Sequence, residues 1–289
     1  MKSWRPSILI GTLVCGASTL VAAIDTPQRV VSINLCTDEL VLALAHPDQV
    51  RSVSYVVKDP AQSTWAFQAK AYPANYNRIE EIVQLRPDLV VANYFSGHGV
   101  LPYLQQQRVT TLIVPQIHSF AELKLQLQRL GAALNNPHAA EHVFSKLDLD
   151  LQSARRKIHY PKYRALIFRP GGLTENRPSF IVELLEHAGL TNAAAELSSA
   201  AWPRVNAETL AQLKPDLILF IGSSKSESAL AYEKMQHAVF QRYVAQKRIL
   251  YLPVNLFSCG SSASVQALEL LIRKVQEFHL EQTQPGRLS

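Results

Sequence analysis

Two stretches of the chain, Glu80–Ala92 "EEIVQLRPDLVVA" and Glu208–Phe220 "ETLAQLKPDLILF", repeat one pattern that decides the fold. Each begins with an acid, continues as an amphipathic helical segment ending in Gln-Leu and a basic residue, and then reads Pro-Asp-Leu before an aliphatic run. Proline stops the helix because it lacks the backbone N–H and restricts the residue before it. The aliphatic run is typical of a strand covered on both faces. The duplication therefore predicts two α/β halves built on the same plan.

Further segments alternate in the same way on either side of the repeated pattern. Aliphatic runs near residue 31 and at 110–115, 165–168 and 248–253 predict more strands. Helical patterns separate the strands, and they occupy Glu39–Ala45, Ser119–Leu134, Ser179–Ala188 and Ser262–Phe278. Strands that alternate with helices favour a parallel sheet in each half.

The segment between the two halves predicts one long helix. Pro137 suits the first helical position, and neither glycine nor another proline follows until Pro161. Apolar residues recur near helical spacing along this segment. We therefore expect a continuous helix over Pro137–His159 that joins the halves stiffly. The predicted fold is α/β, with two lobes that contain central parallel sheets and are joined by a single long backbone helix.

The first residues predict export. Lys2 and Arg5 precede the apolar run Ile8–Val14, and Val21–Ala23 offers the small residues of a cleavage site, so a signal peptide would end at Ala23. The run is short and interrupted for a membrane anchor. Cys15 raises a lipoprotein alternative, although lipid attachment favours a small residue where Val14 stands. The expected divisions are a signal peptide at 1–23, an N-terminal lobe at 24–136, a bridging helix at 137–160, a C-terminal lobe at 161–280 and a flexible tail at 281–289.

Composition and charge exclude some partners. The chain has 289 residues, of which 47% are hydrophobic and 18% charged, and its formal charge is +6. Its basic residues are scattered, with one short cluster at 155–157, so no nucleic-acid partner is indicated. Cleavage after residue 23 would leave two cysteines, Cys36 and Cys259, in an oxidising compartment. Whether they pair depends on whether the fold brings them together.

Two α/β lobes, a bridging helix and an export signal resemble the periplasmic substrate-binding proteins of ABC importers for metal chelates, among them cobalamin, haem and siderophore binders. The resemblance covers essentially the whole chain after the signal, and "E-x-x-x-x-L-[RK]-P-D-L" is its most specific part. It implies a monomer that binds a metal chelate, carries no cofactor, and delivers its ligand to an inner-membrane permease. It also implies that Glu80 and Glu208 dock into arginine pockets of that permease. The simpler alternative is that both acids only favour the positive ends of their helices.

Two further stretches are similar to the cobalamin-binding branch. "AWPRVNAETL" at 201–210 resembles its tryptophan-proline segment, in which the position of Trp202 lines the cleft, and "SVSYVVKDP" at 52–60 resembles the loop that supplies an aromatic residue, here Tyr55. The last cleft loop departs from the branch. It reads "NLFSCGSS" and keeps Phe257 but little charge, which leaves the ligand open between a corrinoid and an iron complex.

The segment "INLCTDEL" at 33–40 supplies another part of the predicted cleft. It is the first strand-to-helix turn, and ligands of parallel sheets gather beyond the carboxyl ends of the strands. Tyr94 and His98 follow the first Pro-Asp-Leu strand, and Arg169 stands in the matching turn of the second lobe. The resemblance to siderophore binders implies that Arg169 or Arg177 would meet an anionic chelate, and the simpler alternative is that these arginines are solvated at the surface. The full set of candidate ligand-binding residues is Leu35, Cys36, Tyr55, Tyr94, His98, Arg169, Trp202, Phe257 and Cys259.

Two other classes of function remain as alternatives. A bare metal ion needs several converging ligands, whereas His138 and His142 fall on the predicted linker helix. A periplasmic thiol-redox enzyme would use Cys36 and Cys259, but these residues lack C-x-x-C spacing. The sequence also lacks G-x-S-x-G, H-E-x-x-H and phosphate-loop motifs, so we predict a protein that is not an enzyme.

Overall fold

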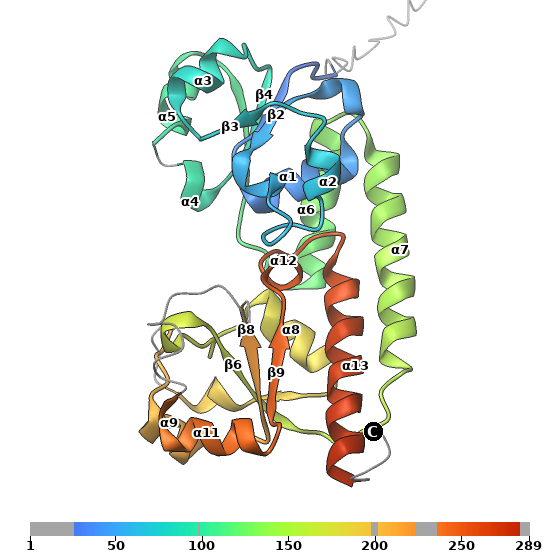
Figure 1. Cartoon of the computed structure of the whole chain (residues 1–289). Helices are drawn as coiled ribbons and strands as arrows, with labels where there is room; N and C mark the ends of the chain where they lie inside the picture. The colour runs from blue at the N-terminus through green and yellow to red at the C-terminus, as the bar shows by residue number, and fades with distance from the viewer. Residues whose placement is uncertain (1–25, 98, 198–201, 223–235, 284–289) are drawn as a thin grey trace, which may run out of the picture.

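Two parallel sheets flanked by helices make up the computed structural model, which describes residues 26–97, 99–197, 202–222 and 236–283 (Figure 1). The expected signal peptide, Cys15 and His98 lie outside these residues. The first sheet has the order β3-β2-β1-β4-β5 and the second the order β7-β6-β8-β9, with every pairing parallel. The strands are β1 Val30–Ser32, β2 Val50–Ser54, β3 Ala74–Asn75, β4 Leu89–Asn93, β5 Thr110–Val114, β6 Arg164–Phe168, β7 Thr191–Asn192, β8 Leu217–Ile221 and β9 Ile249–Leu252.

Helices cover both sheets. In the N-terminal lobe they are α1 Leu35–Leu44, α2 Ala66–Ala69, α3 Ile79–Gln84, α4 Tyr94–Gly97, α5 Leu101–Gln106 and α6 Phe120–Ala133. The later helices are α7 Pro137–Arg155, α8 Phe180–His187, α9 Ala207–Leu213, α11 Ala238–Ala245, α12 Val254–Phe257 and α13 Ser264–Thr283. No helix within the described ranges is long and apolar enough to cross a membrane.

The repeated sequence pattern is also a repeated backbone conformation. Arg86 and Lys214 stand directly before the two prolines and have positive φ values of 46° and 44°, so each helix ends in a left-handed residue. Each following aspartate then fixes the start of the neighbouring strand. Asp88 accepts hydrogen bonds from the N–H groups of Gln28 and Arg29 at 2.9 and 2.8 Å, just before β1. Asp216 accepts one at 2.7 Å from the N–H of Arg164, the first residue of β6.

The aliphatic runs of the repeat are the central strands of the two sheets. β4 lies between β1 and β5, and β8 lies between β6 and β9. All five residues of β8 are buried, and four of the five in β4 are buried. The prediction of strands covered on both faces is therefore confirmed, and burial of these side chains in the two lobes supplies much of the hydrophobic stabilisation.

The bridging helix α7 is shorter than expected. It ends at Arg155 instead of continuing to His159. Two tertiary contacts hold the chain beyond it on the C-terminal lobe, since Lys157 forms an ion pair with Glu269 and the Tyr160 hydroxyl donates to the carbonyl of Ala188. The two-lobe α/β fold is confirmed.

The last helix, α13, packs along α7 and extends to Thr283 (Figure 1). It therefore includes residues 281–283, which the sequence reading placed in a flexible tail. The long helical pattern at 262–278 had indicated this helix, but not where it ends.

Candidate ligand cleft

A cavity of about 270 Å³ lies between the lobes, at the carboxyl ends of both sheets. Its position follows from the strand order. The order reverses between β1 and β4 in one sheet and between β6 and β8 in the other, and such switch points leave a crevice beyond the strand ends. The N-terminal lobe contributes Cys36, Thr37, Leu40, Asn93, Phe95 and Val114–Ile117. The rest of the chain contributes Arg169, Glu175, Ser179–Ile181, Leu184, Trp202 and Phe257–Gly260.

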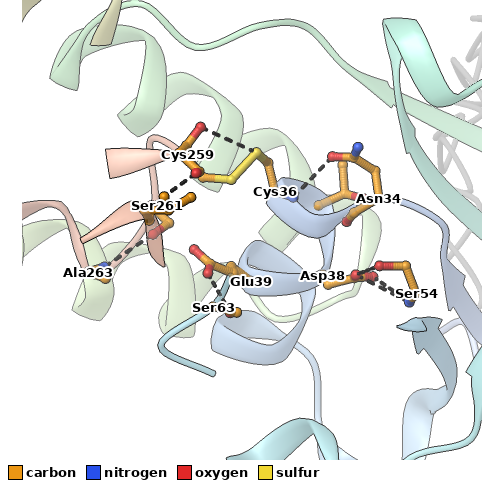
Figure 2. The surroundings of a disulfide bond; sticks show 12 residues. Asn34, Cys36, Asp38, Glu39, Ser54, Ser63, Cys259, Ser261 and Ala263 are labelled. Atoms are coloured by element: carbon orange, nitrogen blue, oxygen red, sulfur yellow. Dashed lines mark hydrogen bonds between the residues drawn. A yellow bond between two sulfur atoms is a disulfide. The ribbon is translucent and has the colours of Figure 1, made fainter. Parts of the chain in front are cut away.

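A disulfide between Cys36 and Cys259 lines this cavity (Figure 2). Cys36 is in the first turn of α1, where the Asn34 side chain caps the helix by accepting a hydrogen bond from the Cys36 N–H at 3.0 Å. Cys259 follows α12, and the two Cα atoms are 5.3 Å apart. The fold thus decides the question that the sequence left open, because it brings together two cysteines that are 223 residues apart.

The wall from the C-terminal lobe contains an internal ion pair. The Arg169 guanidinium contacts the Glu175 carboxylate, with both Nε and NH2 at 3.0 Å from Oε1. The Glu175 side chain is buried and also accepts a hydrogen bond from the Ser179 hydroxyl. Arg169 therefore lines the cavity, but a carboxylate beside it already balances its charge.

Two predicted aromatic residues line the same wall in different ways. Trp202 is 47% exposed, so its ring is accessible from the cavity, whereas Phe257 is only 4% exposed and belongs to the core as well. The exposure of Trp202 argues against the alternative that it is an interior anchor of the second lobe. The backbone directly after Trp202 is held in place, because the Pro203 carbonyl accepts a hydrogen bond from the Thr174 N–H.

Behind Cys36, α1 buries two carboxyl groups (Figure 2). Burial raises the pKa of Asp38 to about 6, although hydrogen bonds from Ser32 and Ser54 oppose the shift. Burial also raises the pKa of Glu39, against hydrogen bonds from Ser63 and Ser261. Asp38 accepts from both the N–H and the hydroxyl of Ser54, so it holds the end of β2 immediately before Tyr55.

Exposed aromatic rings stand at the carboxyl ends of three N-terminal strands. Tyr55 follows β2 and Tyr76 follows β3, and their rings stack with centroids 4.9 Å apart. Tyr94 and Phe95 follow β4 and meet edge to face. Tyr76 was missed in the sequence because β3 has only two residues and gives no periodic signal. The available signal was its position directly before "NRIEEI", the segment that leads into α3.

The structure places the sequence-predicted residues in three groups. The cavity wall includes Cys36, Arg169, Trp202, Phe257 and Cys259. Tyr55 and Tyr94 are exposed at strand ends outside the lining, and Leu35 packs against the core instead. Glu80 and Glu208 are exposed in the first turns of α3 and α9. Glu175, Ser179 and Phe180 line the cavity and were not predicted as site residues.

These features define a two-lobed α/β protein with a cavity between its lobes, at the carboxyl ends of both sheets. The chain belongs to the periplasmic binding protein family, whose model matches residues 30–255.

Individual relatives are distant. The chain is 24% identical over 212 residues to an uncharacterized ABC transporter substrate-binding lipoprotein, YvrC, of Bacillus subtilis, covering 70% of this chain and 66% of that protein, just under two thirds of its length. It is 25% identical over 225 residues to the vitamin B12-binding protein of Pectobacterium atrosepticum, covering 75% of this chain and 77% of that one. The periplasmic haem-binding protein RhuT from Roseiflexus superposes with a TM-score of 0.70 at 21% identity, covering 87% and 99% of the two chains.

Proposed function

We propose that this protein is the periplasmic solute-binding component of an ABC import system and captures a metal chelate in its inter-lobe cleft. The observation that carries the proposal is the cavity at the carboxyl ends of both sheets, with exposed aromatic rings beside it. The relatives support this class of ligand, because they include proteins named for vitamin B12 and haem binding. A corrinoid and an iron complex are both consistent with this chemistry.

The size of the cavity supports a ligand that is only partly enclosed. Its volume of about 270 Å³ is near the lower limit for sites that enclose a drug-sized molecule. A corrin or porphyrin ring is larger than this, so one edge would enter the cavity and the rest would lie against its rim. Trp202 and Phe95 then offer flat apolar faces, which suit stacking on a macrocycle.

The charge of the wall bears on which chelate is favoured. Because Glu175 balances Arg169, that arginine does not attract an anion as an unpaired one would. The predicted role of Arg169 in meeting an anionic chelate is therefore weakened. Within this function, the ion pair favours a chelate of low net charge, such as a corrinoid, over a strongly anionic ferric siderophore.

Delivery would use the two exposed glutamates. Glu80 and Glu208 occupy equivalent helix starts in the two lobes, and within the described ranges neither carboxylate takes part in an ion pair. Two unpaired charges on a stiff two-lobe frame suit simultaneous docking on a membrane permease. The partner is thus a permease, and the protein acts outside the cytoplasm after export.

The alternative of bare metal-ion binding has less support. Among the described residues, no group of three or more His, Cys, Asp and Glu side chains is placed to hold a metal ion. His138 and His142 lie on the exposed face of α7, away from the cavity lining. A thiol-redox enzyme has no supporting relative among those described above.

Replacing Trp202 by alanine tests the cleft. We expect Trp202→Ala to weaken chelate binding by about 1–3 kcal/mol, because a large apolar contact is lost. This corresponds to about a 5- to 150-fold rise in Kd. The melting temperature should change little, because the side chain is 47% exposed. Titrations with cyanocobalamin, haemin and a ferric hydroxamate, followed by thermal unfolding, measure both effects.

Tyr103→Ala is the matched control for this variant. Tyr103 is also an exposed aromatic residue, at 39%, but it does not line the cavity. The Tyr103→Ala variant should bind the chelate as tightly as the unchanged protein does. If Trp202→Ala binds normally but melts far earlier, Trp202 is a core residue and the cleft assignment is wrong. If none of the three chelates binds the unchanged protein, the proposed ligand class fails.

A further inference from the structure

The Cys36–Cys259 disulfide connects the two lobes across the cleft. Cys36 belongs to α1 of the N-terminal lobe, whereas Cys259 follows α12, the short helix after strand β9 of the second sheet (Figures 1 and 2). Both cysteines are half-buried and line the cavity. A small reagent that enters the cleft therefore reaches the sulfur atoms from the same side as a ligand would.

Among the residues that the structure describes, the segment 254–263 around Cys259 makes few other polar contacts with the N-terminal lobe. The Asn255 side chain donates to the Pro60 carbonyl at 2.9 Å, and the Ser261 side chain forms a hydrogen bond with Glu39. The carbonyl of Ser258 is 3.9 Å from the Cys36 Sγ, which is a weak contact. The disulfide is the one covalent bond among these contacts, and it is therefore the strongest of the contacts named here between segment 254–263 and the N-terminal lobe.

The same segment also forms part of the cavity. Four consecutive residues, 257–260, line it. Gly260 is packed so closely that a Cβ atom there would lie 2.9 Å from the side chains of Ile117 and Phe180, which come from different lobes. A shift of the segment would therefore alter the cavity wall and the contact between the lobes together.

We propose that the Cys36–Cys259 disulfide is a redox-modifiable tether, which a dithiol entering the cleft reduces and thereby loosens segment 254–263 from the N-terminal lobe. One thiolate of the dithiol attacks a disulfide sulfur, forms a mixed disulfide and releases the other cysteine as a thiol. The second thiol of the reagent then resolves the mixed disulfide. The reagent is oxidised to its disulfide, and the two electrons and two protons that it gives up convert Cys36 and Cys259 to free thiols.

The tether would also regulate ligand release, and this part rests on the proposed function. A ligand in the cavity covers the disulfide and slows its reduction. Conversely, a loosened wall holds the ligand less firmly, because linkage between two sites is reciprocal. Ligand-loaded protein is therefore expected to keep its tether, and reduced protein to release its ligand sooner.

The first test needs no ligand. The folded, full-length protein is incubated with dithiothreitol without denaturant, and the free thiols are alkylated and mapped by mass spectrometry. We expect alkylation at Cys36 and Cys259 while the circular dichroism spectrum stays that of the folded protein. Hydrogen exchange of the amides in 254–263 should rise about tenfold, whereas exchange in β8 should not change.

Three results of this test would overturn the proposal. The first is a disulfide that resists dithiothreitol until the protein is denatured. The second is a protein that unfolds as a whole on reduction, since the disulfide would then be a structural staple. The third is unchanged exchange in 254–263 after complete reduction.

The second test measures ligand release with the variant Cys36→Ser/Cys259→Ser, because dithiothreitol itself reacts with iron and cobalt complexes. Cyanocobalamin or haemin should dissociate about tenfold faster from this variant than from the oxidised protein. Equal dissociation rates would reject regulation of the ligand by the tether. If neither chelate binds either protein, the proposed function fails. The hydrogen-exchange measurement needs no ligand and would still test whether reduction loosens segment 254–263.

Discussion

Uptake of the ligand should fall at least about 100-fold when both Glu80 and Glu208 are changed to lysine. Each carboxylate is exposed in the first turn of its helix, and the two turns precede the central strands of the two lobes. If these acids dock on a permease as proposed, a lysine at both places would replace attraction with repulsion, and like charges brought together at an interface cost several kcal/mol. Loss of both contacts also removes the gain from docking at two points at once. Uptake of labelled cyanocobalamin in the native host measures this effect.

Ligand affinity in solution should stay unchanged in the same double variant, because neither glutamate lines the cavity. Glu141→Lys/Glu277→Lys is the matched control. It carries the same change in net charge on exposed positions of α7 and α13, on the other side of the molecule from α3 and α9 (Figure 1). The control should transport normally. Normal uptake by the Glu80/Glu208 variant would remove both acids from the docking surface, and a loss of affinity would place them in the cleft.

The sequence predicted the architecture because the determinants of the fold are local and duplicated. Pro-Asp-Leu marks a strand start in both lobes, and the aspartates at 88 and 216 each bind the N–H groups at the start of a neighbouring strand. Periodicity does not fix where a helix ends, so the apolar spacing alone did not predict that α7 stops at Arg155 instead of His159. The ion pair of Lys157 and the hydrogen bond of Tyr160 are tertiary contacts and decide that boundary.

The site was predicted less completely, for a physical reason. Residues at strand ends can be found from strand positions, as Cys36 and Arg169 were. Their partners come from elsewhere in the chain. Glu175 sits in an irregular segment with no periodic signal, and the fold places it in the cavity wall, where it pairs with Arg169. Cys259 forms a disulfide with Cys36, which is 223 residues away in the sequence, and no local pattern encodes this pairing.

A buried acid beside the cleft should make the stability of the protein depend on pH. Burial raises the pKa of Asp38 from 3.8 to about 6 in the folded state. The folded protein therefore binds this proton more tightly than the unfolded chain does. The resulting stabilisation is complete below pH 3.8 and is lost as the pH rises through 6, because the carboxylate must then be charged inside the protein. A rise in pKa of this size corresponds to about 3 kcal/mol.

The comparison of the unchanged protein with Asp38→Asn isolates this effect, since asparagine has the same shape and does not titrate. Urea unfolding of both proteins from pH 4 to pH 8 gives the difference in their unfolding free energies. We expect that difference to move by about 2.5 kcal/mol against the unchanged protein between pH 4 and pH 8, because part of the change lies below pH 4. Most other groups cancel in the difference, apart from neighbouring Glu39, whose charge contributes to the raised pKa of Asp38.

Ser54→Ala provides a second check on the cause. The Ser54 hydroxyl donates to the Asp38 carboxylate and lowers the pKa of Asp38, so its removal should raise that pKa further. The decline in stability should then continue to a higher pH in Ser54→Ala and become larger, while the pH at which it begins stays the same. If the difference in unfolding free energy between the unchanged protein and Asp38→Asn does not vary with pH, Asp38 is not the group that titrates. Ser54 directly precedes Tyr55, whose ring stacks on Tyr76. Fluorescence of the ligand-free protein over the same pH range would therefore report whether the surroundings of these two tyrosines change when Asp38 is protonated.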